Sequence, residues 1–80
     1  MTNTILLKQK ITESGLKIKY LAASCGVTER TFNNKLKGRT PFVQDEILIL
    51  KKILCLTDDE LAMIFFAEEV EKSSTGGANG

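Results

Sequence analysis

Gly15, Gly26 and Gly38 are the residues that most limit how this chain can fold. Each follows a short run in which apolar side chains recur every three or four residues, the spacing of one helix face. Glycine directly after such a run is typical of a helix C-terminus, because it adopts left-handed backbone angles without a steric penalty. The runs predict helices over residues 4–14, 17–24 and 28–37.

Short polar side chains stand where these helices would begin. Asn3 or Thr4 is expected to cap the first helix, and Thr28 the third. Thr57 and Glu60 match a capping box, in which the threonine hydroxyl accepts from one backbone N–H and the glutamate carboxylate accepts from the other. A further helix is therefore expected to begin at Thr57.

Pro41, the only proline in the sequence, marks a break in the helical pattern. Proline has no backbone N–H and pushes the preceding residue towards an extended conformation, so residues 39–42 are expected to connect two helices. Phe42 is expected to enter the core from this connector. The apolar spacing beyond it predicts an amphipathic helix over residues 44–54 and a last helix from residue 57 towards Val70.

The expected fold is all-α, a compact bundle of five short helices around one core. Phe66 follows Phe65 directly, so only one of the two rings can face that core, and Phe66 is expected at the surface. The apolar stripes predict the following core residues: Leu7, Ile11, Leu21, Ala22, Phe32, Leu36, Phe42, Ile47, Leu48, Leu50, Ile53, Leu54, Leu61, Ile64 and Phe65.

Length and composition indicate one domain. With 80 residues the chain is expected to form a single domain over 1–71, followed by a flexible tail over 72–80 that is rich in glycine and serine. The first residues contain too few apolar positions for a signal peptide or a membrane span, so a cytoplasmic protein without membrane contact is expected. Cys25 and Cys55 have neither zinc nor disulfide spacing, and the sequence contains no histidine, so both are expected as reduced core thiols without metal or cofactor.

The charges divide along the chain. Residues 1–39 carry eight basic and two acidic side chains, whereas residues 40–80 carry three basic and eight acidic ones. This asymmetry indicates a first half that faces a polyanion and a second half that faces solvent or a partner. Chance clustering of solvated charges is the alternative.

Residues 18–32 have the pattern of a helix-turn-helix. Ala22 is small where the two helices would cross, and Gly26 permits the positive φ of a tight turn. Thr28 caps the second helix of the pair. The side chains expected to fill the wedge between the helices are Leu21, Val27 and Phe32.

This segment resembles the helix-turn-helix domains of phage Cro and repressor proteins and of related bacterial regulators. The likeness rests on Leu21-Ala22, Gly26-Val27-Thr28, Phe32 and Gly38, and the order of helices extends it over residues 4–70. It implies that the helix over 28–37 enters the major groove and that dimers read two half-sites. The chain departs from the family at Ile18, where a polar residue is common, and Lys17 or Lys19 can serve instead.

The resemblance also implies which residues read bases. Arg30 suits guanine O6 and N7, and Asn34 suits adenine N6 and N7, with Asn33 at the margin. Glu29 either accepts from cytosine N4 or only stabilises the helix N-terminus. The residues expected to contact backbone phosphates are Lys17, Lys19, Thr28, Lys35, Lys37 and Arg39.

These observations predict sequence-specific binding of double-stranded DNA by a phage-type regulator, with a homodimer formed through the fifth helix and Phe66. An enzyme is not expected, because no serine or cysteine has an evident base and no phosphate loop is present; no small-molecule substrate is expected either. The alternative is a protein-interaction module, antitoxin-like or anti-repressor-like, that uses the acidic C-terminal helices. A basic, polar face on the helix over 28–37 favours DNA.

Overall fold

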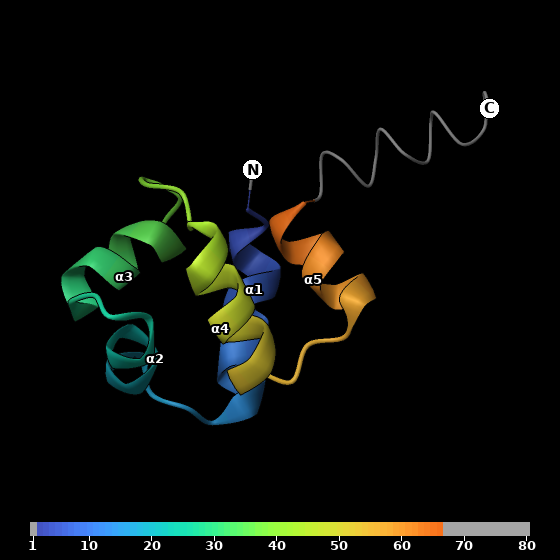
Figure 1. Cartoon of the computed structure of the whole chain (residues 1–80), viewed down its shortest axis with the longest axis horizontal. Coiled ribbons are helices and arrows are strands. Elements are labelled where there is room, and N and C mark those ends of the chain that lie inside the picture. Colours follow the sequence, from blue (N-terminus) through green and yellow to red (C-terminus); the bar gives the residue numbers. More distant parts are fainter. Residues whose placement is uncertain (1, 67–80) are drawn as a thin grey trace.

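The computed structural model describes residues 2–66 and confirms the all-α prediction. Over this range the regular structure is helical and consists of five short helices in a compact arrangement (Figure 1). Their bounds are α1 Thr4–Ser14, α2 Ile18–Cys25, α3 Glu29–Leu36, α4 Gln44–Ile53 and α5 Asp58–Phe65.

The first three helices begin and end at the predicted signals. Asn3 caps α1, where its side-chain oxygen accepts from the Leu6 N–H at 3.1 Å. Gly15 and Gly26 follow α1 and α2 with φ of 73° and 74°, the left-handed conformation expected of glycine at a helix end. The second helix lies one residue later than the predicted 17–24, because Lys17 has extended backbone angles and serves as its N-cap.

The second half of the described chain also follows its boundary signals. Residues 39–42 form the predicted connector between α3 and α4. The capping box is confirmed: Glu60 N–H donates to Thr57 Oγ1 at 3.1 Å, and Thr57 N–H donates to Glu60 Oε1 at 2.9 Å. The expected continuation of α5 towards Val70 and the expected tail over 72–80 lie outside the described residues.

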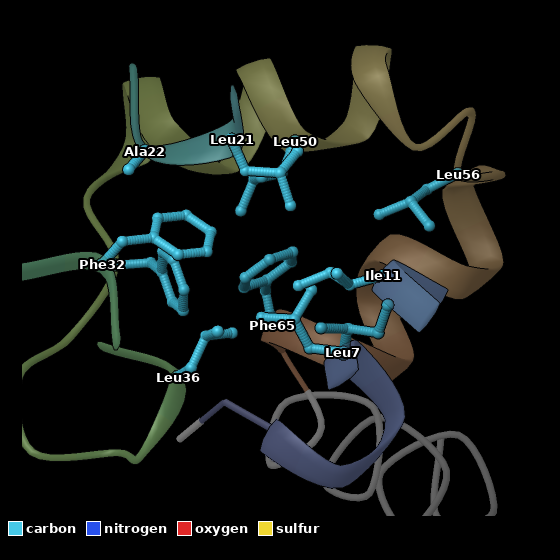
Figure 2. Packing of buried hydrophobic residues seen from close by; sticks show 11 residues of the cluster. Leu7, Ile11, Leu21, Ala22, Phe32, Leu36, Leu50, Leu56 and Phe65 are labelled. Atoms are coloured by element: carbon cyan, nitrogen blue, oxygen red, sulfur yellow. The ribbon is translucent and has the colours of Figure 1, made fainter. Parts of the chain in front are cut away.

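One core joins the helices. Its fully buried side chains come from every helix, and Figure 2 shows Phe32, Leu50 and Phe65 pointing towards the same interior. Phe42 enters from the connector as predicted. Its ring packs edge-to-face against Phe32 and Phe65, with centroid separations of 5.8 and 5.5 Å. Three phenylalanine rings in contact therefore link α3 to α5 within the core.

Two core predictions are wrong. Leu48 is 51% exposed, because it lies on the outer face of α4 with Gln44 and Asp45. Cys55 is exposed and has a φ of 54°, because it stands in the turn after α4. Cys25 is half-buried at the end of α2, and burial raises the pKa of its thiol, which fits a small apolar side chain better than a reactive one.

The N-terminal segment is tied to α5. Asn3 N–H donates to the Ile64 carbonyl at 2.6 Å, and Lys10 forms an ion pair with Glu60. The Lys10 ammonium lowers the pKa of the Glu60 carboxyl, and the hydrogen bond from the Thr57 N–H lowers it further. Within residues 2–66, no helix has the length and apolar content needed to cross a bilayer.

Candidate nucleic-acid interface

α2 and α3 form a closely packed pair at one end of the bundle (Figure 1). Leu21, Ala22 and Phe32 are all buried at or near this junction. The turn between the helices is closed by Val27 N–H, which donates to the Ala22 carbonyl at 3.0 Å, and Gly26 supplies its positive φ. Small and apolar residues thus hold the second helix of the pair in a defined position.

α3 has two unlike faces. Phe32, Lys35 and Leu36 are buried against the rest of the protein. The opposite face is polar, because a helix advances about 100° per residue and this places residues 29, 30, 33 and 37 within one arc. The exposed side chains there are Glu29, Arg30, Asn33 and Lys37.

The two asparagines differ in exposure. Asn33 is exposed, whereas Asn34 is half-buried towards the edge of the polar face. The backbone carbonyl of Asn34 also accepts from the Arg39 N–H at 2.9 Å, which ties the start of the connector to α3. The more accessible amide is therefore that of Asn33, which was expected only at the margin of the base-reading residues.

The expectation that Lys35 contacts phosphate is wrong. The residue is only 9% exposed, and its Nζ donates to both carboxylate oxygens of Glu46, at 2.6 and 2.8 Å. Lys35 lies three residues after Phe32 and one before Leu36, so its position on α3 faces α4 rather than solvent. The same spacing could have predicted this ion pair from the sequence, because a lysine on the apolar stripe of a helix needs a buried partner.

The other basic residues expected at phosphates are exposed. Lys17 and Lys19 stand at the start of α2, and Lys37 and Arg39 stand just beyond the end of α3. Within residues 2–66 none of the four forms an ion pair with a carboxylate. Their charges are therefore not neutralised by this part of the protein.

Thr28 is engaged by its own helix. Its Oγ1 accepts from the Thr31 N–H at 3.1 Å and its hydroxyl donates to Thr31 Oγ1 at 3.0 Å. What the N-terminus of α3 presents outward is therefore its unpaired backbone N–H groups and the exposed Glu29 side chain. A carboxylate in the first turn stabilises a helix through its dipole, as Glu29 does in α3.

Two apolar side chains are exposed at the C-terminal end of α5. Phe66 is 37% exposed, which confirms its predicted place at the surface, and Met63 is 53% exposed. Sequence reasoning missed Met63, which lies on α5, whereas Phe66 directly follows the last residue of that helix.

Comparison with known proteins adds no family assignment, since no family model, curated protein or solved structure matches the chain. Among residues 2–66, no group of three histidine, cysteine or acidic side chains is placed to hold a metal ion. The surface of α2 and α3 is therefore the feature from which a function can be inferred.

Proposed function

We propose that this protein binds specific sequences of double-stranded DNA and acts in the cytosol as a transcriptional regulator of the phage Cro and repressor type. The observation that carries the proposal is the polar outer face of α3, which contains an arginine and an asparagine at the surface while its opposite face is anchored in the core. The major groove of B-DNA admits one α-helix, and these side chains suit base edges. In this proposal α2 and α3 act as a helix-turn-helix.

Arg30 and Asn33 are the proposed base readers. They are three residues apart and both exposed, so they are neighbours on the face that enters the groove. Arg30 donates two hydrogen bonds to guanine O6 and N7, and the Asn33 amide pairs with adenine N6 and N7. Asn34 lies at the edge of this face and is proposed to assist Arg30 and Asn33 in contacting the bases.

Exposed basic residues of α2 and of the segment that follows α3 are the proposed phosphate contacts. Lys17 and Lys19 approach the backbone from α2, whereas Lys37 and Arg39 approach it from the end of α3. Contacts of this kind fix the orientation of a reading helix without selecting a sequence.

A protein-interaction surface is the second candidate function, and the exposed apolar side chains of α4 and α5 favour it. Leu48, Met63 and Phe66 lie at the surface of the half of the chain that is mainly acidic. We propose that Met63 and Phe66 serve a homodimer that binds two half-sites about one helical turn apart. An antitoxin-like or anti-repressor-like partner on the same surface is the competing outcome.

The replacement Arg30→Ala tests the role of α3. The loss of a bidentate guanine contact is expected to cost about 1–3 kcal/mol of binding free energy at one base position and to relax the preference there. Lys37→Ala, the matched backbone control, is expected to weaken all sequences nearly equally. Binding-site selection with both variants and the parent measures the difference. If Arg30→Ala keeps the parent's sequence preference and affinity, α3 is not the reader and the interaction module replaces the DNA proposal.

Dimerisation is tested by stoichiometry on DNA. The parent is expected to saturate a selected duplex at two chains, and Met63→Ser with Phe66→Ser is expected to reduce this towards one chain because two exposed apolar side chains are lost. Ile5→Ser is the matched control, since Ile5 is 80% exposed on α1. Analytical ultracentrifugation of the complexes gives the ratio. One parent chain per duplex at saturation contradicts the dimer.

A further inference from the structure

A groove of about 490 Å³ lies where α1, α2 and α3 meet. Its apolar lining comes from Ile11 and Ile18, which belong to α1 and α2, and from Leu36 at the end of α3. Lys8 of α1 and Lys17 at the start of α2 also line it. The fold therefore brings together two lysines from separate helices, and it does so next to the last residue of the proposed reading helix.

The charge of this groove is of one sign. Both lysines are exposed, no acidic residue is among the lining side chains, and within residues 2–66 neither lysine has a carboxylate partner. Like charges on low-dielectric walls raise the local positive potential, because apolar side chains do not screen it. Such a groove favours an anionic occupant with some apolar surface.

We propose that Lys8 and Lys17 together hold one segment of the DNA sugar-phosphate backbone, so that α1 contributes a phosphate contact through Lys8. The inference rests on the proposed function and deepens it. Phosphate oxygens accept from the two ammonium groups, and the deoxyribose carbons lie over the apolar lining. The two lysines supply the phosphate contact that Ile18 cannot make, because an isoleucine side chain has no hydrogen-bond donor. The Ile18 side chain instead forms part of the apolar lining.

The salt dependence of DNA binding tests this assignment. Each phosphate contact that a lysine makes contributes roughly −0.9 to the slope of log Kobs against log salt. Lys8→Gln and Lys17→Gln are each expected to make the slope shallower by about 0.9 and to weaken random and selected duplexes by the same factor. Lys52→Gln is the matched control, because Lys52 is an exposed lysine on α4. Melting curves of all variants show whether folding is unchanged.

The outcomes separate the two proposals. A parent whose binding does not respond to salt contradicts DNA binding as a whole. A steep parent slope together with a Lys8→Gln slope equal to that of Lys52→Gln leaves the proposed function intact and overturns the role of Lys8. A shallower slope for Lys8→Gln and Lys17→Gln, with unchanged melting, supports the shared backbone contact.

Discussion

Lys35→Met is expected to lower the free energy of unfolding by about 3–5 kcal/mol, far more than the loss of a surface lysine. The side chains of Lys35 and Glu46 are 10% and 7% exposed, and the ammonium donates to both carboxylate oxygens. Methionine fills the space of the lysine stem but leaves the Glu46 charge buried without its cation. An uncompensated buried charge is much more costly than the intact pair.

The matched variants distinguish this cause from a loss of packing. Lys52→Met makes the same replacement at an exposed position and is expected to change the free energy of unfolding by less than about 1 kcal/mol. Lys35→Met combined with Glu46→Gln removes both charges, and the amide oxygen can still accept from the Val43 N–H, as the carboxylate does at 3.0 Å. The double variant should therefore be more stable than Lys35→Met alone. Urea denaturation of the four proteins measures these differences, and a cost for Lys35→Met equal to that of Lys52→Met contradicts the mechanism.

The helix boundaries could be predicted from sequence because their causes are local. Gly15 and Gly26 adopt the left-handed conformation that ends a helix, and Thr57 with Glu60 forms a capping box within four residues. Such signals act through neighbouring backbone groups, so they do not depend on the rest of the fold. The one-residue difference in α2 arises because Lys17 has extended backbone angles and serves as the N-cap instead of the first helical residue.

The errors arose where a residue's surroundings come from distant parts of the chain. The prediction that Lys35 contacts phosphate rests on its charge, but the environment of this residue is set by α4, which supplies Glu46. Leu48 has an apolar side chain at an exposed position of α4. Local pattern gives the orientation within one helix, whereas burial depends on which helix packs against it.

The candidate site shows the same division. Arg30 and Asn33 could be placed on the outer face of α3 from their spacing relative to Phe32 and Leu36. The meeting of Lys8 with Lys17 could not, because it needs the packing of α1 against the α2 and α3 pair. The greater exposure of Asn33 relative to Asn34 likewise comes from the structure and not from the sequence.

Phe32→Ala is expected to destabilise the protein by about 3–5 kcal/mol, because it removes a ring that is fully buried and leaves a cavity. The ring also packs edge-to-face on Phe42, which in turn packs on Phe65, so its loss removes one end of the aromatic chain. The matched control is Phe66→Ala, the same truncation at a partly exposed position. Phe66→Ala is expected to lower the free energy of unfolding much less, because the ring is partly exposed and its removal leaves little buried space empty.

Phe32→Ala also separates the two ways in which DNA binding can fail. Phe32 lies on the face of α3 opposite to Arg30, so its truncation acts on the fold and not on the proposed contacts with bases. DNA binding by Phe32→Ala should fall in proportion to the folded fraction and return when lower temperature or a stabilising osmolyte restores folding. Arg30→Ala should lose binding while its melting temperature stays close to that of the parent. Calorimetry beside DNA titrations tests both; weakened binding by fully folded Phe32→Ala would mean that the position of α3 on the core, and not only its presence, sets the affinity.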